Sequence, residues 1–362
     1  MRSHTLLQPA QHRSFRFFLL ILAFLFLFFA SFAMGRYAVR PEKIFCVLLD
    51  AFLRFLSSAL NKLPFIQTSW GLSPFWSAAE AAVILNIRLP RILAAALVGA
   101  ALSVSGVSYQ GMFRNPMVSP DLLGASTGAG FGAALAILCS MNYWGITLNA
   151  FGFGLAAVLL AYLISRSSRM DGTLSMVLAG MMISSLFTSG TSFVKLVADT
   201  DNQLPAITYW LMGSLTSVQG RDVGFAAVPI LFGMIPLFLL RWRMNLLTLS
   251  EAEARSIGVN TRQLKFLVIF CATLMTAASV SISGMIGWVG LIIPHFCRMI
   301  FGYDYRHLIP ASALLGGTFL MLVDDLARTI TTSEVPLGIL TSFVGAPVLL
   351  YLILSGGKSY EA

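Results

Sequence analysis

The chain has 362 residues, of which 57% are hydrophobic and 11% charged, and its mean hydropathy is +0.82. A soluble domain has about 45–50% apolar and about 25% charged residues, so this composition excludes a cytosolic enzyme, a disordered chain and a disulfide scaffold. A net charge of +9 would suggest a nucleic-acid partner in a soluble protein. Here the apolar content indicates a polytopic membrane protein, whose basic residues are first of all indicators of topology.

Apolar runs with few charges predict ten membrane-spanning helices in an all-α fold. The first run, 15–35, is longer than the apolar core of about 7–15 residues in a signal peptide, so we expect it to be a retained span. The other predicted spans are 91–112, 120–141, 145–165, 172–197, 222–240, 264–284, 287–301, 308–327 and 336–355. Residues 1–14 and 356–362 are expected to be cytoplasmic tails, and 15–355 the transmembrane domain.

A long segment, 36–90, separates the first two predicted spans. Its most apolar stretch, 44–60, carries Asp50 and Arg54. Charges inside such a stretch disfavour a span, so we expect an amphipathic helix lying at the membrane interface. The segment as a whole is expected to be periplasmic or interfacial.

Basic residues orient the predicted spans. With the N-terminus inside, more than half of the 24 Lys and Arg residues fall in cytoplasmic segments, whereas the short outer loops hold only Lys195, Arg221 and Arg328. Cytoplasmic loops of membrane proteins carry the excess of positive charge. We therefore expect both termini in the cytoplasm.

Neither a metal site nor nucleotide hydrolysis is expected from this chain. The four histidines form no ligand cluster, and the cysteines, which lack a C-x-x-C spacing, are interpreted as small buried hydrophobic residues: Cys46, Cys139, Cys271 and Cys297. The sequence G-G-K-S near the C-terminus resembles the end of a phosphate-binding loop. Such a loop also needs a glycine five positions before its final glycine, and that position is Leu352. The expected catalytic residues, metal ligands and bound cofactors are therefore none.

Two arginines flank a proline in R-L-P-R, residues 88–91, at the outer end of the second predicted span. We expect the proline to begin the helix and the guanidinium groups of Arg88 and Arg91 to point outward. They would either anchor lipid headgroups or form a docking patch for an acidic partner, since arginine pairs with carboxylates through two hydrogen bonds. Arg328, at the outer end of the ninth span, would join that patch.

Residues 241–263 form the longest basic cytoplasmic loop. Ser250 is a plausible N-cap, acidic residues follow it in the first turn, and Gly258 suits a helix end. The pattern predicts a short helix over about 250–257, which is either a plain connector or a lever held by a cytoplasmic partner.

A tight turn with two prolines, Arg114–Pro120, follows the second span and is either a plain turn or the lip of a gate.

An ion-coupled transporter should place a carboxylate or histidine near the middle of the membrane. Asp324 and Asp325 instead lie near the outer end of their span. This favours an energy source outside the chain.

Four motifs in order resemble the FecCD family of ABC-importer permeases: R-L-P-R through S-P-D-L-L-G (88–124), E-A-E-A-R-S-I-G-V (251–259), S-G-M-I-G-W-V-G-L-I-I-P-H-F-C-R (283–298) and E-V-P-L-G-I-L-T-S-F-V-G-A-P-V (334–348). The resemblance covers about 88–355 and implies a type II importer fold like that of the cobalamin-importer permease, with ten spans. Segment 36–87 is longer than the family pattern.

The resemblance also implies partners and site residues. Two permeases, expected here as a homodimer in the cell inner membrane, would pair around a pathway, with two ATPases that use ATP on the cytoplasmic face and a periplasmic binding protein outside. The matching positions for binding-protein docking are Arg88, Arg91 and Arg328; for the ATPase coupling helix, Ser250, Glu251, Ala252, Gly258 and Val259; for the cytoplasmic gate, Asn115, Pro116, Met117 and Thr173.

The expected cargo is an iron chelate, such as a siderophore complex or haem, with cobalamin or molybdate as alternatives within the same family. An ion-coupled secondary transporter is the alternative outside it. No nucleic-acid partner is expected.

Overall fold

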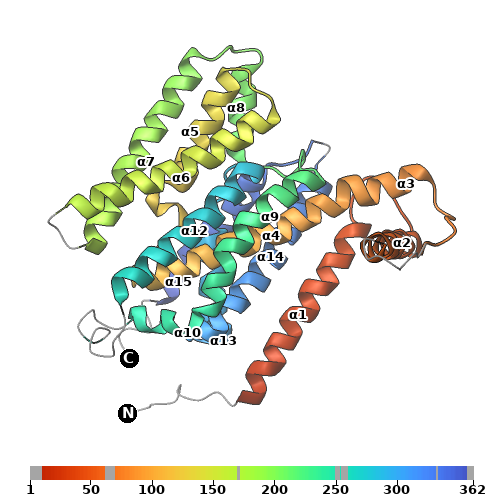
Figure 1. Cartoon of the computed structure of the whole chain (residues 1–362), viewed down its shortest axis with the longest axis horizontal. Coiled ribbons are helices and arrows are strands. Elements are labelled where there is room, and N and C mark those ends of the chain that lie inside the picture. Colours follow the sequence, from red (N-terminus) through yellow and green to blue (C-terminus); the bar gives the residue numbers. More distant parts are fainter. Residues whose placement is uncertain are drawn as a thin grey trace.

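The computed structural model describes residues 10–61, 70–168, 172–248, 253, 260–331 and 333–356, and throughout these the regular structure is helical (Figure 1). The helices in chain order are α1 (Ala10–Ala33), α2 (Pro41–Leu60), α3 (Ala78–Ala82), the π-helix η1 (Val83–Arg88), α4 (Leu89–Met112), the 3₁₀-helix η2 (Pro120–Leu123), α5 (Ala125–Leu138), α6 (Tyr143–Ser167), α7 (Gly172–Val197), α8 (Gln203–Met212), α9 (Gly220–Leu239), α10 (Arg241–Met244), the 3₁₀-helix η3 (Asn245–Thr248), α12 (Thr261–Ser283), α13 (Val289–Phe301), α14 (Tyr305–Thr329) and α15 (Leu337–Gly356).

Each of the ten predicted spans coincides with a helix of this structure. By length and apolar composition, seven helical segments of the described chain are able to cross a membrane. The other three ranges hold shorter apolar helices: Ala125–Leu138, Val289–Phe301 and Leu337–Tyr351. The chain is therefore a multi-pass membrane protein.

Helices α4 and α12 form the centre of the bundle. About four fifths of the most apolar window of each is buried inside the protein, whereas α1 is mostly exposed. In Figure 1, α14 and α13 lie beside α4, and α5, α6 and α7 pack together on the opposite side of α12. In lipid, helices associate by close packing because surrounding acyl chains supply no hydrophobic drive.

Glycines allow very close contacts between helices. A Cβ atom built on Gly106 of α4 would lie 1.8 Å from the carbonyl oxygen of Gly290 in α13, and one on Gly99 would lie 2.2 Å from that of Gly316 in α14. Any larger residue would push these backbones apart.

Helical structure does not begin at the R-L-P-R motif, contrary to the sequence prediction. It runs without a break from Ala78 through η1 into α4. Proline has no N–H and clashes with the preceding turn of an α-helix. The wider turn of η1, with a hydrogen bond from the Leu89 N–H to the Ile84 carbonyl, precedes Pro90 and lets the helix continue past it.

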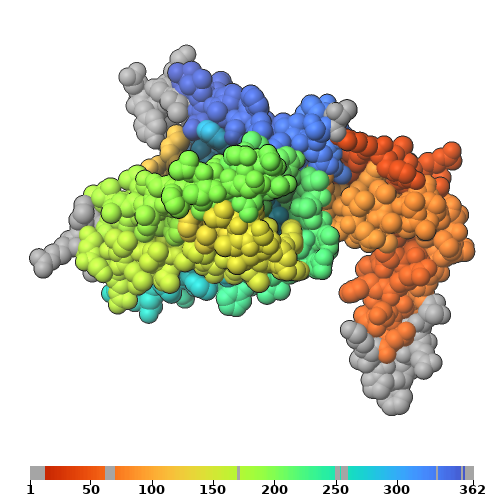
Figure 2. Space-filling model, turned by 90° about the horizontal axis from the view of Figure 1, so that it is seen from above, coloured from red at the N-terminus to blue at the C-terminus, as the bar shows by residue number. Residues whose placement is uncertain are grey.

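The described residues of segment 36–90, namely 36–61 and 70–90, form an arm beside the bundle. Helix α1 packs on α14, and the connection 34–40 leads to α2, which is seen end-on in Figure 1 while the bundle helices lie across the view. From above, the red and orange residues of this arm project from the body of the molecule (Figure 2). The predicted helix at 44–60 is present as α2.

Candidate functional site

Three arginines from two distant parts of the sequence meet at one end of the bundle, in a group that we call the arginine cluster: Arg88, Arg91, Asp324, Asp325, Arg328 and Glu334. Arg91 is its centre. Its Nε lies 2.9 Å from both carboxylate oxygens of Asp324, and its Nη1 lies 2.8 Å from Oε2 of Glu334. One guanidinium group thus joins α4 to α14 and to the connection before α15.

Arg328 completes the cluster from within α14. Its Nη2 donates to Asp325, three residues earlier, and its Nε lies 3.3 Å from Oδ2 of Asp324. The Ser31 hydroxyl of α1 donates to the other oxygen of Asp325 at 2.6 Å. Helices α1, α4 and α14 are therefore linked by one polar network in which every acid has a basic or hydroxyl partner.

Arg88 has a different environment. Its side chain donates to the carbonyl of Phe32 at 2.5 Å and to that of Tyr37. These carbonyls lie at and just beyond the end of α1, where orphan backbone acceptors need partners. Arg88 therefore fastens the end of α1 to the start of α4.

The guanidinium groups do not point outward as the sequence predicts. Arg88, Arg91 and Arg328 are only 3%, 5% and 7% exposed. The acceptors of Arg88 and Arg91 come from the backbone of the α1 end and from acids more than 200 positions away from Arg91, which a local motif does not reveal. Glu334 is the acid with the most exposed side chain around Arg91, at 27%.

Glu334 was not singled out from the sequence and is the cluster's most accessible group. Burial raises its pKa, but the Thr216 hydroxyl, which donates to Oε2 at 2.6 Å, and the Arg91 guanidinium lower it more, so that its pKa lies below the usual value. The side chain is therefore ionised at neutral pH and joins the α8–α9 connection to the cluster.

The predicted gate turn lies at the other end of α4. Asn115 accepts a hydrogen bond from the Met117 N–H at 2.9 Å, and residues Asn115, Pro116 and Met117 are exposed. Arg91 and Met112 are 21 positions apart on one helix, a rise of about 30 Å, which is the thickness of the hydrocarbon core. The arginine cluster and the turn therefore belong to opposite membrane surfaces.

Arg114 connects this turn to the segment that precedes the long polar loop. Its backbone is in the left-handed region, with φ of 52°, and its Nε donates to the Leu247 carbonyl at 2.9 Å. Neighbouring Asn245 donates to Asp304 at 2.9 Å and accepts from the Tyr305 N–H. Helix α4, the start of α14 and the entrance to loop 249–259 are thus held together.

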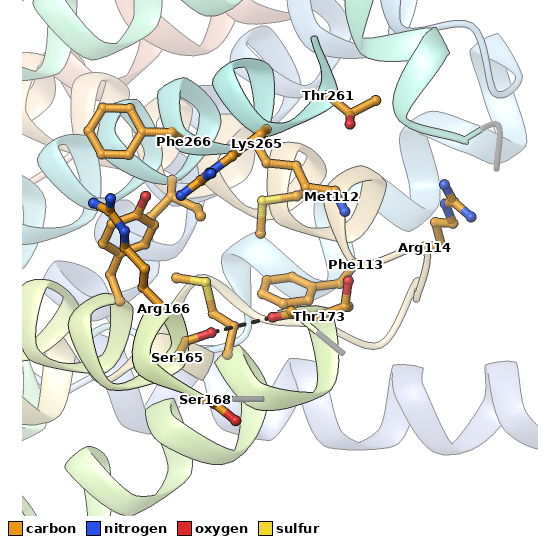
Figure 3. Close-up of a pocket in the computed structure, with 15 residues that line it drawn as sticks. Met112, Phe113, Arg114, Ser165, Arg166, Ser168, Thr173, Thr261, Lys265 and Phe266 are labelled. Atoms are coloured by element: carbon orange, nitrogen blue, oxygen red, sulfur yellow. Dashed lines mark hydrogen bonds between the residues drawn. The ribbon is translucent and has the colours of Figure 1, made fainter. Parts of the chain in front are cut away.

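A cavity of about 820 Å³ opens at this same end, between the ends of α4 and α6 and the starts of α7 and α12 (Figure 3). Thr173 lines it together with Phe113 and Arg114, whereas Asn115, Pro116 and Met117 are not among its described lining residues. The lining also includes three basic residues: Arg166, Arg262 and Lys265. The structure therefore brings Thr173 near the beginning of the turn but not its tip.

The predicted coupling residues, Ser250, Glu251, Ala252, Gly258 and Val259, lie outside the described residues. Their flanks are described: η3 ends at Thr248, and α12 begins at Thr261 after an Asn260 cap that accepts from the Gln263 N–H. The loop's two ends are thus anchored at the face that carries the Arg114–Leu247 hydrogen bond. Within the described part of the chain, no group of three His, Cys, Asp or Glu side chains is placed to hold a metal ion.

Comparison with known proteins decides the family. The model of the FecCD transport family matches residues 21–355, nearly the whole chain. The chain belongs to the FecCD family. Permease subunits of this family are the transport components of ABC importers and leave ATP hydrolysis to separate subunits, so this FecCD chain is not itself an enzyme.

Relatives of this FecCD chain differ in cargo. It is 42% identical over 280 residues to the molybdate import system permease MolB of Haemophilus influenzae, covering 76% of this chain and 83% of that one. It is 37% identical over 329 residues to the hemin transport system permease HmuU of Yersinia pestis, covering 88% and 97%. A solved inward-facing structure of a metal-chelate-type ABC transporter is 36% identical, with a TM-score of 0.80 and coverage of 93% and 98%.

Proposed function

We propose that this FecCD permease carries an iron chelate, such as haem or a siderophore complex, inward across the cell inner membrane, driven by ATP that partner subunits hydrolyse. The observation that carries the proposal is the pair of polar sites at the two ends of α4. One end holds the arginine cluster, and the other holds the turn and the flanks of loop 249–259. A single helix, α4, thus connects the surface where an outer partner would bind to the surface where an inner partner would bind.

The arginine cluster is proposed as the docking surface for a periplasmic binding protein, with Arg88, Arg91 and Arg328 as its cations. The cluster is already neutralised internally, which has a consequence for how docking works. A partner carboxylate would have to displace Glu334 from Arg91 or bind beside it, because Asp324 is almost completely buried. Electrostatic attraction at such a surface favours rapid and specific encounter.

Loop 249–259 is proposed as the element that a cytoplasmic ATPase holds, with Ser250, Glu251, Ala252, Gly258 and Val259 at the contact. The Arg114–Leu247 hydrogen bond supports this role, since it ties the segment before the loop to the turn at the end of α4. Movement of the loop would then move the gate residues Asn115, Pro116, Met117 and Thr173. Alternating access of this kind requires two states whose populations ATP binding shifts.

A homodimer with the pathway between two copies is proposed from the outer face of α7. This face carries one methionine and three hydroxyl residues in a row, where a purely lipid-facing helix would be expected to carry aliphatic residues: Met181, Ser185, Thr188 and Ser192. The Thr188 and Ser192 hydroxyls donate to carbonyls of their own helix. Such a surface holds no chelating group and would let a bulky chelate pass without binding it tightly.

The cargo and orientation are tested together in proteoliposomes that contain the permease, its ATPase and its binding protein. We expect ATP-dependent uptake of a radiolabelled iron chelate, with both termini on the ATPase side. Molybdate is the second candidate because of the 42% identity to MolB. Uptake of molybdate and not of iron chelates would replace the proposed cargo, and uptake driven by an ion gradient alone would overturn the ATP-driven mechanism.

A further inference from the structure

Helix α2 carries large apolar side chains on its outward face, where a helix on a soluble protein would carry polar residues. Phe45, Phe52 and Phe55 are 64%, 59% and 72% exposed. They are spaced seven and three residues apart, so they project from one face of the helix. Three exposed phenylalanines in one row form an apolar surface whose exposure to water is unfavourable.

The face of α2 that packs on the protein holds the polar residues Asp50 and Ser57 together with Ile44 and Val47. Asp50 is buried, accepts from the Leu72 N–H at 2.9 Å and pairs with Arg54 at 2.8 Å. Lys43 pairs with Glu80 of α3 at 2.7 Å. The partners of these charges all lie within α2 itself or in the segment 70–88, so the polar face of α2 is already satisfied by the arm. The phenylalanine face, by contrast, is left largely uncovered by the described part of the chain.

The position of α2 indicates what covers that face. α2 follows α1 after the short connection 34–40, and it runs across the direction of the bundle helices (Figure 1). α1 presents its own exposed phenylalanines, among them Phe26 and Phe29 near its end, to the lipid around the bundle. The α2 face therefore continues a lipid-facing surface at the level where α1 leaves the membrane.

We propose that α2 lies flat on the bilayer at the arginine-cluster end of the protein, with Phe45, Phe52 and Phe55 inserted among the lipids. Helices of this kind bury their apolar face about 5–10 Å into the boundary between headgroups and acyl chains. The helix has 20 residues and is about 30 Å long, so it extends the footprint of the protein well beyond the bundle (Figure 2). The inference requires only that the chain spans a membrane and does not depend on its cargo.

Site-directed spin labelling in lipid nanodiscs tests the proposal. Single cysteines replace Phe45, Phe52, Phe55 and, as a control, the exposed Arg54 on the other side of the helix, in a chain whose four native cysteines are changed to serine. We expect the three labels at the phenylalanine positions to collide with oxygen more often than with a water-soluble nickel chelate, at one common depth of about 5–10 Å. The label at position 54 should show the reverse preference.

Two results would overturn the proposal. Labels at 45, 52 and 55 that collide freely with the nickel chelate would show that the face is in water. Labels that are shielded from both reagents would show a protein partner, and dependence of that shielding on added binding protein would identify which one. If the cysteine-free chain does not fold, Phe52→Trp in the native chain gives the same answer: brominated lipid must quench it more than it quenches the parent protein.

Discussion

Arg91 and Asp324 face each other across 233 positions of sequence, and Nε and Nη2 of the arginine approach the carboxylate at 2.8 to 2.9 Å. Both side chains are nearly inaccessible. A buried ion pair of this kind depends on close contact between the two groups, because either charge alone would be very unfavourable in a buried site. The pair therefore fixes α4 against α14 at the end where we propose that the soluble partner docks.

Removing the acid should destabilise the fold. Asp324→Leu leaves Arg91 buried with only Glu334, and loss of one member of a buried pair costs about 3–5 kcal/mol. We expect a clear fall in the thermal unfolding temperature of the purified permease. The double variant Arg91→Met with Asp324→Leu should recover much of the loss, since it removes both charges. If the single variant is as stable as the parent, the pair does not hold α4 and α14 together.

Binding of the periplasmic protein should depend on the charge of the cluster arginines themselves, and not only on their contribution to the fold. Arg91→Glu should weaken binding of the periplasmic protein by about 2–5 kcal/mol, as expected when a desolvated charge loses its partner. Arg221→Glu, an exposed arginine at the start of α9, serves as the control and should bind normally. Calorimetry measures both affinities. Rescue by reversing an acid on the binding protein distinguishes lost docking from misfolding, and unchanged affinity in Arg91→Glu would refute the assignment.

Protonation of Glu334 at acidic pH should weaken its interactions with Arg91 and Thr216. Its folded pKa lies below the ordinary value of 4.5, so its contribution to stability is fully present above pH 4.5 and is lost as the pH falls through the folded pKa. The unfolding temperature of the parent should therefore decline more steeply below pH 4.5 than that of Glu334→Gln. Differential scanning fluorimetry across this range measures the difference. Parallel curves for the two proteins would mean that Glu334 gains nothing from Arg91 and Thr216.

Coupling should weaken when Arg114 is shortened. Arg114→Ala removes the hydrogen bond to the Leu247 carbonyl, and bonds to charged groups contribute about 1.5–3 kcal/mol. We expect the assembled importer to keep basal ATP hydrolysis while its stimulation by loaded binding protein and its transport rate fall about tenfold. Arg221→Ala is the control at the other end of the bundle. Normal transport by Arg114→Ala would separate the turn from the coupling loop.

A single methyl group should disrupt the contact between α4 and α13. Gly106→Ala places Cβ 1.8 Å from the Gly290 carbonyl, and overpacking of this kind costs about 1–3 kcal/mol. Gly224→Ala in α9 is the matched control, because a Cβ there has no atom within 4 Å. Thermal unfolding should separate the two variants. Equal stability would show that the helices can shift apart without cost.

Apolar runs were sufficient to locate the long helices of the bundle, because membrane spans must be long and apolar, but they did not reveal the short helix α8. Spacing along one helix also predicts that Arg328 meets Asp324 and Asp325, which precede it by four and three residues. The burial of Arg91 was not predictable in this way, since its partners Asp324 and Glu334 come from the far end of the chain. The π-helical turn before Pro90 likewise depends on packing and has no local motif.

The two bonds made by Arg88 have a consequence for how this sequence can change over time. Both acceptors, at Phe32 and Tyr37, are main-chain carbonyls, which every amino acid supplies. Residues around the end of α1 can therefore be exchanged for others without removing the acceptors, whereas lysine at position 88 would lack the second donor arm. Among homologous chains, we expect an invariant guanidinium opposite a variable stretch of sequence.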